Sequence, residues 1–316
     1  MDFNVYCFIY SLMKAKKMKT FGLFLAFSLI VACSDERGFR ESQTFVGVGE
    51  VSASTLSLGK QVYLEYCMAC HGREGAGDGP AAAGSFPPPR NFTQGLYKFG
   101  LVENYGLPTD EDFHRIIKYG LHGTGMFAWD ISDQQIHAVT QYIKTFAADV
   151  WKSEDRTIGD PVRVEPNPYT EQTKAQAIER GKEVYHFAAN CQSCHRAYLS
   201  ESEYTQLYQK VNSTDKKPSF DAEFMYKVKP QYTSYEYSDG RSVKAVPPDF
   251  TWHSVRSAQT VEDLYKRLIV GVEGAGMPGW RGMLSEEDIW ALSYYVKSLM
   301  ELKDHPDRKE FMENLQ

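Results

Sequence analysis

A pentapeptide, Cys67-Met68-Ala69-Cys70-His71, recurs later in the chain as Cys191-Gln192-Ser193-Cys194-His195. The segments that lead into the two copies also match, since Gly59-Lys60-Gln61-Val62-Tyr63 precedes the first and Gly181-Lys182-Glu183-Val184-Tyr185 precedes the second. Downstream, a Phe-Thr pair follows prolines in both copies, at 92–93 and at 250–251. Matching flanks around both pentapeptides indicate that one structural unit has been duplicated.

The repeat extends beyond the Phe-Thr pair. Thr109 and Thr260 each stand three residues before an aspartate, which is the acidic variant of a helix N-cap signal. Both threonines lie the same distance before a methionine, Met126 or Met277, and each methionine follows a Gly-x-Gly turn. Each unit therefore predicts a helix followed by a glycine-rich turn that carries a methionine.

Each unit closes with a helix that begins at a serine, Ser132 or Ser285. The apolar residues of these helices recur at i, i+3, i+7 and i+10, on one helix face, as Ile136, Val139, Ile143 and Phe146 and as Ile289, Leu292, Val296 and Leu299. Nothing alternates convincingly as a strand. We therefore predict an all-α fold of two tandem helical domains, 59–146 and 174–302, joined by a proline-containing charged linker over 147–173 and followed by a tail over 303–316.

The pentapeptide is the attachment signature of c-type haem. Two thiols on one turn of helix can each bond a vinyl group of the porphyrin, and the adjacent histidine can reach the iron. Zinc would need four ligands at each site and leaves the histidines unexplained. A thioredoxin-like pair would need a βαβ setting, which the sequence does not predict. Two copies of the motif favour haem over both alternatives.

Met126 and Met277 are the candidates for the second axial ligand of the iron. A lone methionine usually fills space in a core, and Met225 and Met283 are predicted to do so. The two candidates differ because each follows Gly-x-Gly at a matching position, where a loop with little side-chain bulk can present a thioether. Ligation by histidine and methionine raises the reduction potential.

Each unit resembles a class I cytochrome c, and the chain resembles a dihaem cytochrome c. The resemblance implies two covalent haems, each wrapped by one helical domain. It assigns their attachment and ligation to Cys67, Cys70, His71 and Met126 and to Cys191, Cys194, His195 and Met277. It also implies a proline carbonyl that accepts the other N–H of the haem-binding histidine, for which Pro80, in Gly79-Pro80, fits the first unit, whereas the second unit has no matching Gly-Pro.

The resemblance further assigns Gly59 and Gly181 to a close helix crossing, with Tyr142 and Tyr295 as matched aromatic residues on the partner helices. Arg90 and Arg256 are candidates to bind haem propionates, although solvated arginines are an equally good interpretation. The remaining histidines are predicted to be surface or packing residues, namely His114, His122, His137, His186, His253 and His305.

The second unit carries an insertion at 197–246 that is rich in tyrosine, including Tyr198, Tyr204 and Tyr226. Such an insertion is either a docking surface or a loop that covers a haem edge, and we favour the cover.

The N-terminus has the pattern of an export signal. Four lysines, Lys14, Lys16, Lys17 and Lys19, precede an apolar run over 21–32 that is too short to span a bilayer. The run ends in Val31-Ala32-Cys33, which resembles a bacterial lipobox. An ordinary signal peptide or a single buried helix is the alternative. We predict cleavage of 1–32, lipidation of Cys33, a flexible tether over 33–58, and a membrane-anchored protein on the periplasmic side.

The whole chain has 316 residues, 42% of them hydrophobic, with a formal net charge of −6. This acidic balance argues against nucleic acid as a partner. We predict an electron carrier of a respiratory chain, with donor and acceptor proteins that present basic faces. The alternatives are a dihaem cytochrome c peroxidase, disfavoured because each unit has its own methionine, and a cytochrome subunit of a larger membrane oxidoreductase.

Overall fold

The computed structural model describes residues 38–229, 232–236 and 242–315. The predicted signal segment and Cys33 lie outside the described residues. Within the described part of the chain, no helix is both long enough and apolar enough to cross a membrane.

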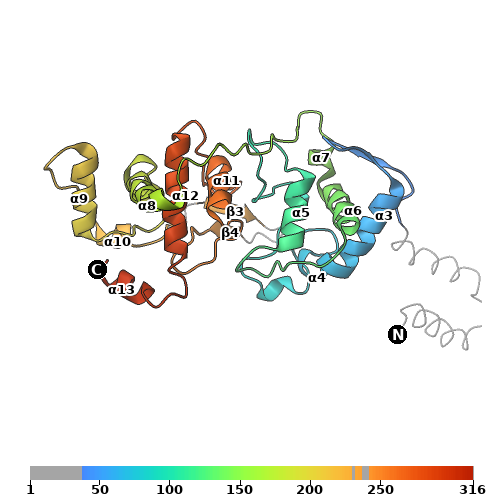
Figure 1. The fold of residues 1–316 in the computed structure, drawn as a ribbon. Coiled ribbons are helices and arrows are strands. Elements are labelled where there is room, and N and C mark those ends of the chain that lie inside the picture. Colours follow the sequence, from blue (N-terminus) through green and yellow to red (C-terminus); the bar gives the residue numbers. More distant parts are fainter. Residues whose placement is uncertain (1–37, 230–231, 237–241, 316) are drawn as a thin grey trace, which may run out of the picture.

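The described residues are mainly helical, and the prediction of an all-α tandem fold is confirmed (Figure 1). The first domain contains β1 (Gln43–Phe45), β2 (Gly49–Val51), α3 (Ala53–Val62), α4 (Met68–His71), α5 (Asp110–Tyr119), α6 (Asp133–Lys144) and α7 (Ala148–Trp151). The second contains α8 (Lys174–Glu183), α9 (Glu201–Asn212), α10 (Ala222–Met225), β3 (Tyr232–Glu236), β4 (Ser242–Ala245), α11 (Val261–Val270), α12 (Glu286–Met300) and α13 (Arg308–Glu313). The strands form two short antiparallel hairpins, β1–β2 and β3–β4.

The predicted helix starts are confirmed. Thr109 and Thr260 cap α5 and α11, and in each case the side chain accepts from the backbone N–H of the aspartate three residues on. Ser132 and Ser285 cap α6 and α12 in the same way. These contacts satisfy N–H groups that a helix start leaves without a partner, so the local sequence alone fixes where the four helices begin.

In the first domain α3 crosses α6 at a glycine, and in the second α8 crosses α12 at a glycine. A Cβ atom at Gly59 would lie 2.1 Å from the carbonyl oxygen of Ala138, and one at Gly181 would lie 2.1 Å from that of Ala291. Neither distance is compatible with a side chain, so only glycine permits this approach. The predicted tyrosines lie at the same crossings, since Tyr142 Cβ and Tyr295 Cβ are the next neighbours.

Residues 38–58 are part of the first domain, in contrast to the predicted flexible tether. Phe45 is 2% exposed and lies in the first hydrophobic core with Val51 and Leu56. The two strands pair antiparallel, with Phe45 opposite Gly49, and the backbone N–H of Val46 donates to the carbonyl of Trp151 at 2.8 Å. Short strands of three residues gave no alternation that the sequence analysis could detect.

The predicted linker and tail also contain packed structure. Trp151 of α7 is fully buried in the first core, where its indole N–H donates to the hydroxyl of Tyr97 at 3.0 Å. At the other end, Leu315 is buried, and Arg308 of α13 donates to the carbonyl of Thr251 at 2.7 Å. The domains therefore extend beyond the helical repeats that defined them in the sequence.

The two domains contact each other through residues 99–106 of the first and through α11 and its following turns in the second. Arg267 of α11 donates to the carbonyl oxygens of Phe99 and Gly100, and Arg281 forms an ion pair with Glu103 at 2.7 Å. Figure 1 shows α5 and α11 on the facing sides of the two helical groups, with the β3–β4 hairpin between them.

Candidate haem-binding sites

The first domain contains a cavity that brings together its predicted site residues. Cys67, Cys70 and His71 line it from the turn into α4, and Met126 lines it from the glycine-rich turn after α5. Most of the remaining wall is apolar, including Phe92, Phe113 and Ile117. An apolar cavity with two thiols, an imidazole and a thioether on its wall matches a macrocycle that is held at its edge and ligated through its metal.

A backbone carbonyl orients the histidine of each pentapeptide. His71 Nδ1 lies 2.9 Å from the carbonyl oxygen of Arg90, and His195 Nδ1 lies 3.3 Å from that of Pro248. Because a carbonyl can only accept, Nδ1 carries the proton and Nε2 keeps its lone pair for a metal. The prediction that Pro80 orients His71 is therefore wrong. Arg90 and Pro248 occupy matching positions, each two residues before the Phe-Thr pair.

The Phe-Thr pair has a structural role that the sequence analysis did not assign. Phe92 stacks on His71 with ring centroids 4.4 Å apart, and Phe250 stacks on His195 at 4.9 Å. The preceding residue, Asn91 or Asp249, accepts from the backbone N–H of the threonine that follows the phenylalanine, which closes an Asx turn.

In both domains this turn holds the orienting carbonyl and the stacked ring in one rigid unit. The Asx-Phe-Thr triplet after the proline run was the signal that could have revealed it.

Burial keeps the donor atoms in their neutral forms. It lowers the pKa of His195 to about 4 and also lowers the pKa of His71. It raises the pKa of Cys67 and of Cys191 to about 12. None of the four motif cysteines forms a disulfide. Neutral imidazole is the form that ligates a metal.

The rim of the first cavity is cationic and is built by both domains. Arg90 and Lys98 come from the first domain, whereas Lys244 and Arg256 come from the second. Burial, together with the charges of Arg90 and Arg256, lowers the pKa of Lys98 to about 8, so the three cations lie close together. Arg256 was a candidate for the haem of its own domain, but it lines the cavity of the other. A group with carboxylates at its edge fits this rim.

The second domain matches the first in how one motif cysteine and the candidate methionine pack on its core. Cys191 and Met277 both pack against the second hydrophobic cluster, as Cys67 and Met126 pack against the first. Met277 also lines a cavity between the domains, where it faces residues of the first domain such as Tyr97 and Gly100. The sixth-ligand candidate of the second site therefore lies beside the wall of the first.

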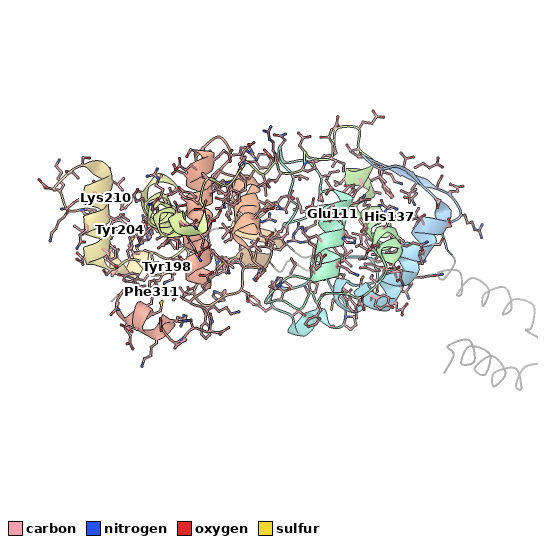
Figure 2. The ribbon with its side chains drawn as sticks, viewed as in Figure 1. Glu111, His137, Tyr198, Tyr204, Lys210 and Phe311 are labelled. Atoms are coloured by element: carbon pink, nitrogen blue, oxygen red, sulfur yellow. The ribbon has the colours of Figure 1, made fainter. Side chains whose placement is uncertain are left out.

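The insertion at 197–246 has two structural roles. Its tyrosines pack within the second domain, where the Tyr198 hydroxyl donates to Asp249 at 3.2 Å and the Tyr204 ring lies against Phe187 (Figure 2). Its end covers the first cavity, since Lys244, Ala245 and Val246 line it. The position of these residues favours the prediction that the insertion is a covering loop over the prediction that it is a docking surface. The cavity it covers, however, is that of the first domain.

Of the other residues examined by sequence, Met225 is buried as predicted, but Met283 is 65% exposed, so its prediction as core is wrong. His186 is a buried packing residue, and His122, His137, His253 and His305 are exposed. Among the described residues, no group of three or more His, Cys, Asp or Glu side chains could hold a metal ion as a zinc site would.

Comparison with known proteins agrees with this geometry. Residues 54–143 match the family model described as cytochrome c oxidase, cbb3-type, subunit III, and residues 178–300 match the family model of cytochrome c. No curated protein matches the chain.

Among solved structures, the chain is similar to one from the Kuenenia stuttgartiensis reducing HAO-like protein complex Kustc0457/Kustc0458. The two chains share 30% sequence identity with a TM-score of 0.58, and the match covers 82% of this chain and 99% of that chain. Both domains thus match cytochrome families and carry haem-attachment motifs in equivalent places. The chain belongs to the c-type cytochromes, haem-binding proteins of electron transfer, and carries two cytochrome c domains in tandem.

Proposed function

We propose that this protein is a dihaem electron carrier that holds one covalent haem in each domain. The observation that carries the proposal is the first cavity, which gathers Cys67, Cys70, His71 and Met126 on one apolar surface. Each thiol adds across one vinyl group, so its proton and sulfur both go to the porphyrin side chain and no oxidant is needed. The haem supplies one-electron chemistry at its iron.

The chain's own residues would set the properties of each haem. His71 and His195 present Nε2 because their Nδ1 atoms donate to carbonyl oxygens. Met126 and Met277 would complete the coordination, and a thioether ligand raises the potential. Apolar walls keep water away from the iron, and the cations Arg90, Lys98 and Arg256 would hold the carboxylates at the rim.

The number and attachment of the haems can be counted. A pyridine haemochrome assay on denatured protein should give two haems per chain that resist acid–acetone extraction. Replacing both Cys67 and Cys70 by serine should leave one. A wild-type value of one, or release of all haem by extraction, would refute the proposal.

The axial ligands can be tested one site at a time. Met126→Ala should convert only the first haem from low-spin to high-spin, and Met277→Ala only the second. Met283→Ala is the matched control, because this methionine is exposed and should leave both spectra unchanged. Low-spin spectra in both single variants would show that other residues ligate the irons.

We further propose that the protein transfers electrons between proteins and makes or breaks no substrate bond. Each domain has its own candidate methionine ligand, Met126 or Met277, and this supports the carrier role, since peroxide chemistry needs an open coordination position. The similar Kuenenia chain is part of a structure described as a reducing HAO-like protein complex, which supports a redox protein as partner. Rapid peroxide turnover by the wild type would favour the peroxidase, and co-purification of a stoichiometric oxidoreductase would favour a subunit role.

The proposed location is the periplasmic side of a membrane, with lipidated Cys33 as the anchor. The multiple acyl chains of a lipoprotein bind a bilayer stably, whereas one chain binds only marginally. Cys33→Ala, with a substitute cleavage site, should release soluble haem-containing protein. Retention of that variant on membranes washed with high salt and carbonate would contradict the anchor.

A further inference from the structure

Arg267 is a buried cation at the contact between the domains. It lies on α11 with 5% of its surface exposed. The matching position of the first domain, aligned through Thr109 and Thr260, is Ile116, which lines the first cavity. The first copy therefore has an apolar residue here, whereas the second has a guanidinium that contacts the other domain.

The guanidinium binds neutral oxygens from both domains. Its Nη1 donates to the carbonyl of Gly100 at 3.1 Å and to that of Gly271 at 3.0 Å. Its Nη2 donates to the carbonyl of Phe99 at 3.1 Å, and Nε donates to Ser257 Oγ at 3.1 Å. The same group lies over the Phe99 ring, 5.6 Å from its centroid. One planar fork thus fixes three backbone carbonyls relative to one another.

These carbonyls belong to the two haem sites. Phe99 and Gly100 form part of the wall of the first cavity, and Gly271 begins the turn that carries Met277. The same turn makes a second contact across the interface, because Glu273 accepts from the backbone N–H of Tyr97. Arg267 therefore joins the wall of one haem site directly to the ligand loop of the other.

We propose that Arg267 is a positioning residue for electron exchange between the two haems, an inference that rests on the proposed dihaem function. In that exchange one iron is oxidised as the other is reduced, and no bond of the protein changes. The rate of such tunnelling falls steeply with distance, so it depends on how firmly the two sites are held together. Arg267 supplies this constraint because its hydrogen bonds span the interface from a fully packed position.

The test compares three variants of the full-length, haem-loaded protein. Arg267→Ile installs the residue of the first repeat, and Arg267→Lys keeps the charge without the planar fork. Arg115→Leu is the matched control, because Arg115 donates to the same Phe99 carbonyl at 2.7 Å but lies within the first domain. The measurements are haem content, the spectrum of methionine ligation, the radius of gyration by small-angle scattering, and the rate of interhaem electron equilibration after rapid partial reduction.

Arg267→Ile should slow the equilibration by about tenfold or more and increase the radius of gyration, with both haems present and both methionines bound. Arg267→Lys should fall between this variant and the wild type, and it decides the question if the isoleucine variant loses a haem. Arg115→Leu should match the wild type. A wild-type rate and radius in an Arg267 variant that holds two haems would overturn the proposal. A wild type with a single haem would instead overturn the dihaem function beneath it.

Discussion

A carbonyl oxygen and a stacked phenylalanine fix the orientation of each candidate haem-binding histidine. The phenylalanine belongs to a triplet that closes an Asx turn, Asn91-Phe92-Thr93 or Asp249-Phe250-Thr251, and the carbonyl is that of the residue just before the triplet, Arg90 or Pro248. The loop after the motif therefore determines which ring nitrogen of the histidine carries the proton, because its carbonyl oxygen accepts from Nδ1. In the second domain Asp249 also pairs with Arg196, the residue that follows His195, at 3.0 Å. Motif and turn are thereby tied together at a second point.

Replacement of Gly181 by alanine should destabilise the second domain. The added methyl group would lie 2.1 Å from the Ala291 carbonyl oxygen, and backbone cannot move aside cheaply. Overpacking of this kind costs about 1–3 kcal/mol or more, which exceeds the gain of about 1 kcal/mol in helix propensity. Gly84→Ala is the control, since a Cβ there meets no atom within 4 Å. Thermal unfolding of the haem-loaded variants measures both, and equal stability would argue against the crossing.

His186 should make the second domain sensitive to acid. Burial lowers its pKa from 6.5 to about 4, and its ring bonds the carbonyl of Lys182 and the N–H of Tyr198. Between these pH values the unfolded chain binds a proton that the folded domain excludes, so stability falls as the pH falls from about 6.5 to 4, by about 3 kcal/mol in total.

The acid sensitivity is measured by chemical denaturation across this pH range. His186→Gln should flatten the slope, whereas His305→Gln, at an exposed site, should keep it. The same slope in His186→Gln and in the wild type would assign the acid response to other groups.

At the scale of single residues, the features that depend on which side chain stands at a position could be predicted from the sequence. The helix caps are short-range signals, and the two crossing glycines were implied by the resemblance to class I cytochromes c; the structure confirms both. The orienting carbonyl was assigned to the wrong residue, because every residue has a carbonyl and its direction depends on the turn. Arg256 and Arg267 act on the other domain, a contact between segments far apart in sequence that no local pattern reports.

Among the elements, the β1–β2 hairpin changes the most from its predicted role. It precedes the duplicated unit, yet its residues complete the first core beside α3 and α7. Helices with a long apolar stripe were predictable because many residues repeat the same signal. Strands of three residues, and helices of four such as α7, contain too few residues to establish a period.

Phe45→Ala should therefore destabilise the first domain, by about 3–5 kcal/mol, as truncation of a buried phenylalanine does. Tyr119→Ala is the control, since Tyr119 is 66% exposed and its loss should change stability by less than about 0.5 kcal/mol. Chemical denaturation, followed through the absorbance of the first haem, measures the difference. If residues 43–51 are a tether after all, both variants will unfold with the wild type.

At the scale of the whole molecule, the charge balance predicts how partners approach. Removal of 1–32, as proposed, deletes four lysines and one aspartate and takes the formal net charge from −6 to −9. An acidic molecule attracts basic partners, and salt screens that attraction beyond about 8 Å at physiological ionic strength.

The rate of electron transfer to a basic electron-transfer protein should therefore fall as salt is added. With an acidic protein of similar size the rate should rise, because salt then screens a repulsion. Stopped-flow measurements across a salt series make the comparison. Rates that do not vary with salt for either protein would remove the steering effect.

Because both domains contribute to the wall of the first cavity, the parts of this wall are synthesised at different times. The ribosome completes residues 38–151 well before it makes Lys244, Val246 and Arg256, so the nascent first domain exists for a time with one side of its cavity open. In the full chain the second domain closes that side of the cavity. The haem proposed for the first domain would therefore enter most readily before the second domain docks.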